Sequence, residues 1–176
     1  MSVHAILVNG APGAGKTSFE QMCSYILGPY YRARSTVDKV KEIARQLGWN
    51  GEKDVAGRKF LSDLKDALTE YNDLPFNDVM QAFTQFGEEL ENYDIDSQKG
   101  VIFIDVREPK EIERLKKATN GVTLFIQREL AEQKETSNHA DANVRDYDYD
   151  YYIDNNGTYA ELERKAIGFL KDIGAV

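Results

Sequence analysis

Between residues 10 and 17 the chain reads Gly10-Ala11-Pro12-Gly13-Ala14-Gly15-Lys16-Thr17, which matches the phosphate-binding pattern G-x-x-x-x-G-K-[ST]. The short apolar run Val3–Val8 precedes it, and apolar residues at helical spacing follow it as far as Gly28. In a strand–loop–helix unit the glycines let backbone N–H groups turn toward phosphate oxygens at a helix N-terminus. We therefore predict a P-loop that binds a nucleoside triphosphate, in preference to a plain turn.

Two side chains in this stretch carry most of its chemistry. Lys16 is expected to reach the β and γ phosphates of ATP, and the Thr17 hydroxyl to bind Mg²⁺. The residues expected to contact the donor nucleotide are Gly10, Ala11, Pro12, Gly13, Ala14, Gly15, Lys16, Thr17 and Ser18, together with Arg128 after a later strand. ATP and Mg²⁺ are thus the predicted cofactors.

A second apolar run, Val101–Asp105, ends in an acid. Strands of this kind often flank a P-loop, and Asp105 is expected to hold Mg²⁺ through water; the alternative is an Asp that caps the following turn. Val106 comes next, where many motor-type hydrolases carry a Glu that activates water. The sequence therefore favours transfer to a bound acceptor over hydrolysis, and the lack of an Asn-Lys-x-Asp sequence disfavours a GTPase.

Basic side chains are the candidates for holding the acceptor. Arg107 follows the second strand, at the carboxyl edge where open α/β sheets bind ligands, and a guanidinium donates two parallel hydrogen bonds to a phosphate. The predicted catalytic residues are Lys16, Asp105 and Arg107. The residues predicted to contact the acceptor are Asp38, Lys41, Arg58, Lys65 and Arg107. The predicted metal ligands are Thr17 and Asp105.

Other conspicuous residues have structural interpretations. For Arg32 and Arg34 a solvated surface arginine is an equal alternative to a ligand contact. Trp49 and the tyrosine-rich segment 147–152 are expected to pack within the protein rather than stack on a base. Residues 154–157, Asp-Asn-Asn-Gly, resemble a GTPase element but lie too near the C-terminus, so they are interpreted as a turn.

The alternation of strands and helices predicts an α/β fold of the three-layer P-loop NTPase type, a parallel sheet with helices on both faces. Residues 1–176 are expected to form one domain. Within it, residues 35–93 are interpreted as a helical acceptor-binding insert after the first helix, beginning with Ser35 as a helix cap. The polar stretch 128–146 is a candidate lid. The last helix is expected to start with a capping box at Thr158.

Composition limits the classes of partner. The formal net charge of −8 would repel a nucleic acid backbone, which disfavours a polynucleotide and leaves a small nucleotide as the expected partner. No apolar run has the length of a membrane span. The single cysteine, Cys23, cannot form an internal disulfide and is expected to be buried, which together with the lack of a signal peptide suits a cytoplasmic protein. The oligomeric state stays open, with a homodimer as one option.

Taken with these residues, the chain resembles the deoxynucleoside monophosphate kinases of phages and prophages, a branch of the nucleoside monophosphate kinase-like P-loop proteins. The segments that carry the resemblance are Gly10–Thr17, Ser35–Lys41, Leu47–Trp49, Gly57–Lys65, Ile104–Pro109 and Tyr149–Thr158. The resemblance implies ATP-dependent phosphorylation of a deoxynucleoside monophosphate. It implies that Lys16 and Thr17 contact ATP. It also implies that six residues lie toward the acceptor: Arg107, Asp105, Asp38, Lys41, Arg58 and Lys65.

The chain departs from this family in its lid. Monophosphate kinases of this kind carry several lid arginines, whereas residues 128–145 hold only Arg128, Arg145 and Lys134 as cations besides one histidine. Two alternatives to the family function remain: a kinase of another small metabolite or coenzyme precursor, and a nucleotide-binding protein without catalysis. The sequence leaves open the base and sugar of the acceptor, and whether the acceptor is a nucleotide at all.

Overall fold

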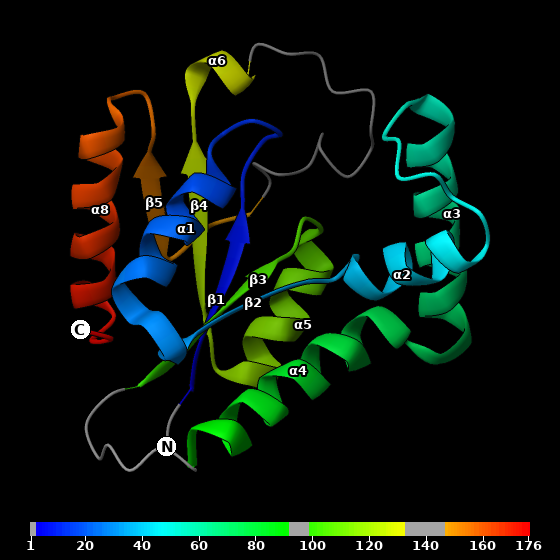
Figure 1. Ribbon diagram of the computed structural model, residues 1–176, viewed down its shortest axis with the longest axis horizontal. Helices are drawn as coiled ribbons and strands as arrows, with labels where there is room; N and C mark the ends of the chain where they lie inside the picture. The colour runs from blue at the N-terminus through cyan, green and yellow to red at the C-terminus, as the bar shows by residue number, and fades with distance from the viewer. Residues whose placement is uncertain (1–2, 92–98, 133–146) are drawn as a thin grey trace.

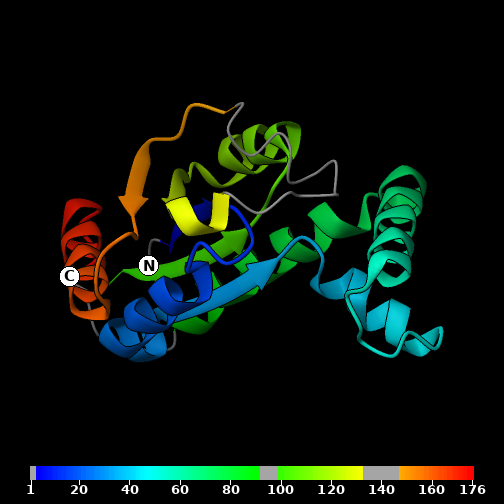
Figure 2. The ribbon, with the colours of Figure 1, turned by 90° about the horizontal axis from the view of Figure 1, so that it is seen from above.

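The computed structural model describes residues 3–91, 99–132 and 147–176. Five parallel strands form one sheet in the order β2-β3-β1-β4-β5, with helices on both faces (Figure 1; Figure 2). The strands are β1 (Val3–Asn9), β2 (Tyr31–Ser35), β3 (Gly100–Asp105), β4 (Val122–Gln127) and β5 (Tyr151–Asp154). The predicted α/β class with a parallel sheet is confirmed.

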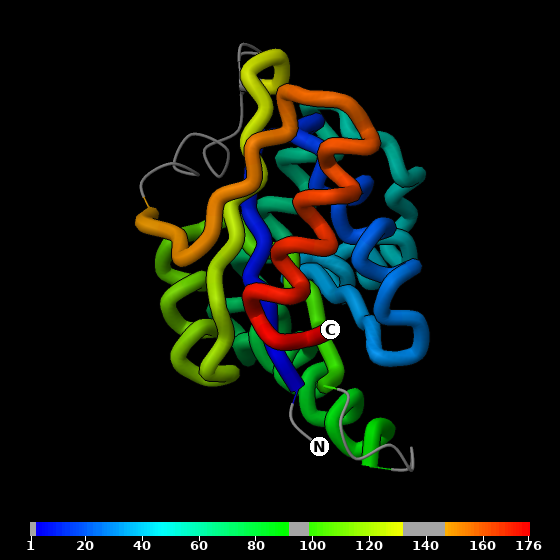
Figure 3. Tube along the Cα trace, turned by 90° about the vertical axis from the view of Figure 1, so that its left-hand side faces the viewer, coloured from blue at the N-terminus to red at the C-terminus, as the bar shows by residue number. Residues whose placement is uncertain are grey.

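The helices are α1 (Lys16–Leu27), α2 (Asp38–Gln46), α3 (Val55–Asn72), α4 (Leu74–Glu91), α5 (Pro109–Thr119), α6 (Glu129–Glu132) and α8 (Tyr159–Asp172), with a 3-10 turn at Gly28–Tyr30. Helices α1 and α8 lie side by side on one face of the sheet (Figure 3). Helices α4 and α5 cover the other face, while α2 and α3 stand on the side of the molecule away from β5 and α8 (Figure 1). No helix among the described residues is long and apolar enough to cross a membrane.

Aromatic side chains fill the space between the sheet and the pair α1 and α8. The ring of Phe19 in α1 lies 5.8 Å from that of Phe169 in α8 and 6.5 Å from that of Phe103 in β3, measured between centroids. Burying side chains of this size stabilises the fold by about 1.5–3 kcal/mol each relative to exposure. This packing fixes α1, and with it the loop that precedes it, against the central strands.

Strand pairing decides which side chains face α1. Ser35 at the end of β2 lies opposite Asp105 at the end of β3. Side chains alternate between the two faces of a strand, so Asp105 shares its face with Phe103, which contacts α1. The carboxylate predicted to bind a metal ion is therefore on the side of the sheet that carries the P-loop helix.

The predicted helix cap at Ser35 is wrong. Ser35 does not cap a helix: it ends the edge strand β2, and α2 begins only at Asp38, whose carboxylate accepts a hydrogen bond from the Ser35 N–H at 2.8 Å. The two arginines of β2 have partners on α4 that no local pattern reveals. The Arg32 guanidinium lies 4.8 Å from the ring centre of Phe86, and Arg34 makes two hydrogen bonds to one α4 carboxylate.

Two other predictions are confirmed, and a third lies largely outside the described residues. The capping box of the last helix is confirmed, because Thr158 Oγ1 accepts from the Glu161 N–H and the Glu161 carboxylate accepts from the Thr158 N–H. Cys23 is buried as predicted, and burial raises the pKa of its thiol to about 12. The candidate lid lies largely outside the described residues, which include only 128–132 of that stretch.

Candidate active site

The loop after β1 folds back at the carboxyl edge of the sheet. Gly10, Gly13 and Gly15 all have positive φ, at 149°, 85° and 98°. A Cβ atom on Gly10 would lie 2.3 Å from the carbonyl oxygen of Ile126 in β4, so only glycine permits this approach. The backbone conformation therefore favours glycine at Gly10 and Gly15, which the motif requires, and also at Gly13, which it leaves variable.

The groups at the start of α1 suit a bound phosphate. No side chain caps the first turn of this helix, and its N-terminus carries the partial positive charge of the helix dipole. Lys16 Nζ donates to the carbonyl oxygens of Gly10 at 2.7 Å and Ala11 at 3.2 Å, which holds the ammonium over the loop. Thr17 is exposed, so its hydroxyl is accessible to a ligand.

Two carboxylates lie close to Lys16. Burial raises the pKa of Asp105, while the positive charges of Lys16 and Arg107 oppose that rise. Glu20, in the second turn of α1, was not singled out by the sequence, yet it is only 9% exposed. Burial and the neighbouring charge of Asp105 raise the pKa of Glu20 to about 8, against the weaker influence of Lys16.

The Asp105 carboxylate and the Thr17 hydroxyl are chemically suited to bind a magnesium ion, because Mg²⁺ prefers oxygen ligands. Among the described residues no three His, Cys, Asp or Glu side chains converge on one point. An ion here would therefore take its remaining ligands from Thr17, from phosphate oxygens and from water. That is the usual arrangement for Mg²⁺, which keeps several waters and binds nucleotides through one or two carboxylates.

Three of the predicted acceptor residues gather around Asp105. Arg107, directly beyond β3, and Lys41 in α2 are close enough to lower the pKa of the Asp105 carboxyl, and the negative charge of Asp38 acts to raise it. Lys41 Nζ lies 3.4 Å from the Asp38 carboxylate, one turn earlier on the same helix. The pair on α2 lies far from Asp105 and Arg107 in the sequence, and the structure brings the two pairs together.

The two predicted acceptor residues on α3 lie in different surroundings. Lys65 pairs with the carboxylates of Glu111 at 2.8 Å and Glu108 at 3.5 Å, and so ties α3 to α5. Arg58 is exposed and donates from Nε to the Lys53 carbonyl oxygen at 2.7 Å. Contacts of these two side chains with an acceptor stay predictions.

Asn9, the last residue of β1, is a connecting residue that sequence reasoning missed. Its side-chain amide donates to the Arg107 carbonyl oxygen at 3.0 Å and to the Tyr149 hydroxyl at 2.8 Å. Its side-chain oxygen accepts from the Gly10 N–H at 2.8 Å. One fully buried amide thereby joins the P-loop to the segment that carries Arg107. The sequence did offer one signal for this role, because Asn9 is a polar residue at the end of an apolar run that was expected to be a buried strand.

The segment after β5 also touches the P-loop. Asn155 Nδ2 donates to the Ala14 carbonyl oxygen at 2.8 Å, and a Cβ atom on Gly15 would lie 2.2 Å from that same nitrogen. The segment connects a strand to a helix, as its interpretation as a turn requires, but it also supports the loop. Nothing in the local sequence indicates this contact, because its partner lies 141 positions away.

Arg128 lies on the side of the site next to the P-loop. It follows β4, whose Ile126 carbonyl oxygen contacts Gly10, and it precedes α6, whose Ala131 Cβ lies 4.0 Å from the position of a Cβ on Gly13. This position agrees with a contact to the donor nucleotide, which stays a prediction for the Arg128 side chain itself.

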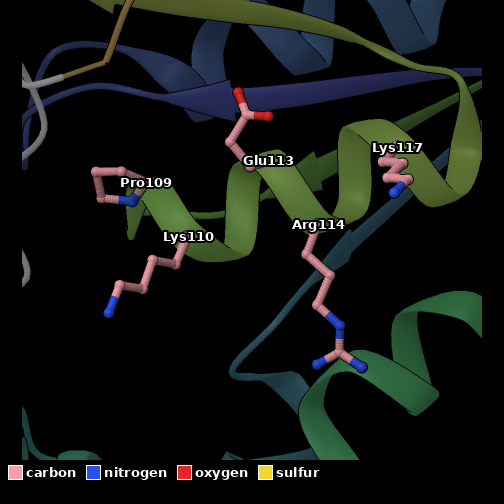
Figure 4. A pocket seen from close by; sticks show the side chains of 5 residues that line it. All are labelled: Pro109, Lys110, Glu113, Arg114 and Lys117. Carbon is pink, nitrogen blue, oxygen red and sulfur yellow. The ribbon is translucent and has the colours of Figure 1, made fainter.

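Two hollows lie away from the P-loop. A hollow of about 470 Å³ on the outer face of α5 is lined by Pro109, Lys110, Glu113, Arg114 and Lys117 (Figure 4). Its charged side chains diverge, with Glu113 pointing away from Lys110 and Arg114 (Figure 4). A second hollow, of about 50 Å³, lies between α3, α4 and α5 beside Phe76. Arg114 borders both and is held there by the Asp73 carboxylate and the Phe76 ring. The charged side chains of the larger hollow therefore do not converge on a ligand (Figure 4).

Solved structures with a similar arrangement cover nearly the whole chain. A sugar kinase from Janibacter sp. HTCC2649 shares 15% identity at a TM-score of 0.52, over 99% of this chain and 97% of that one. TT1252 from Thermus thermophilus shares 14% identity at a TM-score of 0.50, over 98% and 99%. A dephospho-CoA kinase from Campylobacter jejuni shares 16% identity at a TM-score of 0.47, over 97% of each.

At these identities the likeness shows the fold alone. No protein-family model matches the chain, and no curated protein sequence matches it significantly.

Proposed function

We propose that this protein is an ATP-dependent phosphotransferase that moves the γ-phosphate of ATP to a small phosphorylated acceptor, a nucleoside or deoxynucleoside monophosphate. One observation carries the proposal: Lys16 of the P-loop and Arg107 of the neighbouring strand end both act on the same half-buried carboxylate, Asp105. This supports a site in which a cation for the donor phosphate and a cation for an acceptor phosphate both lie near the acid proposed to hold the metal ion.

The residues divide the work of phosphoryl transfer between them. The loop N–H groups and Lys16 bind the β and γ phosphate oxygens, and Arg107 orients the acceptor so that its oxygen lies in line with the bond to be broken. Thr17 and Asp105 would hold Mg²⁺, which supplies charge neutralisation as the γ-phosphoryl group moves. Transfer forms the bond from phosphorus to the acceptor oxygen and breaks the bond to the departing ADP oxygen.

The charges around Asp105 favour a phosphorylated acceptor. Arg107 and Lys41 both approach it, and a second phosphate would use these two cations, whereas a neutral sugar hydroxyl would not. The resemblance of the sequence to monophosphate kinases supports the same choice. A kinase of another small metabolite or coenzyme precursor is the second candidate, and the similarity to a sugar kinase fold agrees with that broader class.

The proposal predicts that ATP turnover requires an acceptor, because Val106 cannot activate water and the loop alone only binds phosphate. ADP release should be measured with Mg²⁺ and a panel of ribo- and deoxynucleoside monophosphates, with sugars as a comparison set. We expect at least one monophosphate to raise the rate by about tenfold or more over ATP alone. Equal rates with and without every acceptor would contradict the kinase proposal and indicate an ATPase. Stimulation by sugars alone would favour a kinase of another small metabolite.

A further inference from the structure

Glu20 is the one residue of the described chain whose buried side-chain oxygen lacks a hydrogen-bond partner. The residue is 9% exposed, and its Oε1 atom is enclosed without a donor in reach. Leaving a buried polar atom unsatisfied costs about 1–3 kcal/mol, and more for a charged group. Such an atom in a native protein calls for an explanation, and an ion or a water that belongs to the working site is a standard one.

The position of Glu20 on α1 directs it to the metal site. It lies three residues after Thr17 and four after Lys16, spacings that place all three on one face of a helix. The groups whose charges act on the Glu20 carboxyl are Asp105 and Lys16. Asp105 lies on the side of β3 that faces α1, as its alternation with Phe103 shows.

ATP binding changes the charges around Glu20. The Lys16 ammonium acts on both Glu20 and Asp105, and Arg107 and Lys41 act on Asp105 as well. When Lys16 turns to the β and γ phosphates, its positive charge moves away from both acids, while Arg107 and Lys41 stay close to Asp105. A divalent cation with its bound water would restore positive charge beside both acids and would give Glu20 Oε1 a hydrogen-bond donor.

We propose that Glu20 is a further ligand of the divalent-cation site, reaching through a bound water the ion that Thr17 and Asp105 face. The inference deepens the proposed function, since the ion is the one that accompanies ATP. All three side chains offer oxygen only, so the site suits Mg²⁺ and Mn²⁺ rather than a metal that seeks nitrogen or sulfur. Glu20 acts by positioning the ion and does not touch the transferred phosphoryl group.

Mn²⁺ is the probe for the test, because electron paramagnetic resonance counts free and bound Mn²⁺ directly. The titration is run on the whole protein with a non-hydrolysable ATP analogue and again without nucleotide. Loss of an outer-shell metal ligand typically weakens affinity by about 10–100-fold, so Glu20→Gln should bind Mn²⁺ at least about tenfold more weakly than the wild type. Glu70→Gln removes the same charge from the exposed surface of α3 and should leave the affinity unchanged.

Each outcome decides the inference. Affinity of Glu20→Gln equal to that of the wild type overturns it, as does a wild type that binds no Mn²⁺ under either condition. Lower turnover at unchanged Mn²⁺ affinity also overturns it, and would indicate that Glu20 positions Lys16 instead of the metal ion. Thermal melting monitors folding, and if Glu20→Gln does not fold, Glu20→Asp should weaken Mn²⁺ binding by withdrawing the carboxylate one methylene.

The inference and the proposed function fail separately. Weak Mn²⁺ binding in Glu20→Gln, in a protein that phosphorylates none of the acceptors tried, upholds the metal ligand and rejects the kinase. If turnover depends on an acceptor and Glu20→Gln binds Mn²⁺ as tightly as the wild type, the kinase is upheld and the metal ligand is rejected.

Discussion

At the scale of single residues, Lys16 is the side chain on which turnover should depend most. Its ammonium donates to the carbonyl oxygens of the loop, so Lys16→Ala removes the charge that follows the γ-phosphate with little effect on packing. We expect kcat to fall by about 10²-fold or more, in the range seen when one group that stabilises transition-state charge is removed. The Tm should stay near that of the wild type.

Lys171→Ala, on the exposed surface of α8, provides the matched control and should retain full activity. Substantial turnover by Lys16→Ala at saturating ATP would mean that the loop is not the catalytic phosphate site.

Arg107 should serve the acceptor and not ATP, because it follows β3, one strand away from the P-loop strand β1. A charge-assisted hydrogen bond contributes about 1.5–3 kcal/mol, so Arg107→Ala should lower acceptor kcat/KM by at least about tenfold while ATP affinity is retained. Arg107→Lys should recover only part, since an ammonium cannot reproduce the two parallel donors of a guanidinium.

Steady-state kinetics and ATP titration on the same variants make this comparison, with Arg164→Ala on the exposed side of α8 as the control. Weakened ATP binding at unchanged acceptor kinetics would mean that Arg107 contacts ATP and not the acceptor.

Glu20 should make the metal-free protein less stable as the pH rises. Burial first, and then Asp105, raise the pKa of folded Glu20 to about 8 from 4.5, so the folded state holds an extra proton between these values. Folded protein that binds more protons than unfolded protein loses stability with rising pH across that window. Glu20→Gln lacks this loss, and its free energy of unfolding should exceed that of the wild type increasingly from about pH 5 to about pH 8.

Urea unfolding in EDTA at several pH values measures the effect, with Glu70→Gln as the exposed comparison. Parallel pH profiles for wild type and Glu20→Gln would show that the folded carboxyl titrates normally.

At the scale of elements, the edge strand β2 depends on α4. Arg34 donates from Nε and Nη2 to the two oxygens of Asp78 at 2.8 and 2.6 Å, and the pair is half-buried, with side-chain exposures of 32% and 13%. Removing one partner leaves the other charge poorly compensated, so Asp78→Ala should lower the free energy of unfolding by about 1.5–3 kcal/mol.

The pair Lys59–Asp63 on α3 is the control, because its side chains are 74% and 62% exposed. Asp63→Ala should cost no more than about 0.5 kcal/mol, as exposed helix pairs do. Urea unfolding compares the two variants, and equal costs would mean that the Arg34–Asp78 pair holds β2 no more firmly than a surface pair.

The elements also show where local pattern succeeds. The buried runs of β1 and β3 are continuous and apolar, as strands covered on both faces must be, and both were predicted within a residue or two. β2 was missed because its residues alternate apolar and charged at the sheet edge, next to helical signals that begin at Ser35. Its charged side chains are stabilised by α4, some 44 positions further along the chain for Arg34.

At the scale of the whole molecule, the sheet order explains how the site is assembled. β1 lies between β3 and β4, so the loop after β1 has the ends of both neighbours beside it. β3 brings Asp105 and Arg107 to one side, and β4 brings Ile126 and Arg128 to the other. Polar side chains at strand ends were therefore sound candidates from the sequence, because parallel strands end at a common edge.

The sequence by itself determined the P-loop, the α/β class and the buried cysteine. These follow from residues within a few positions of one another: glycines that permit positive φ, apolar runs of strand length and helical spacing. Only the tertiary structure decided that Glu20 is enclosed beside Asp105, that Asn9 joins the loop to Arg107, and that β2 is a strand. Burial and hydrogen bonding between distant segments depend on which surfaces meet, and no local preference of the chain encodes that.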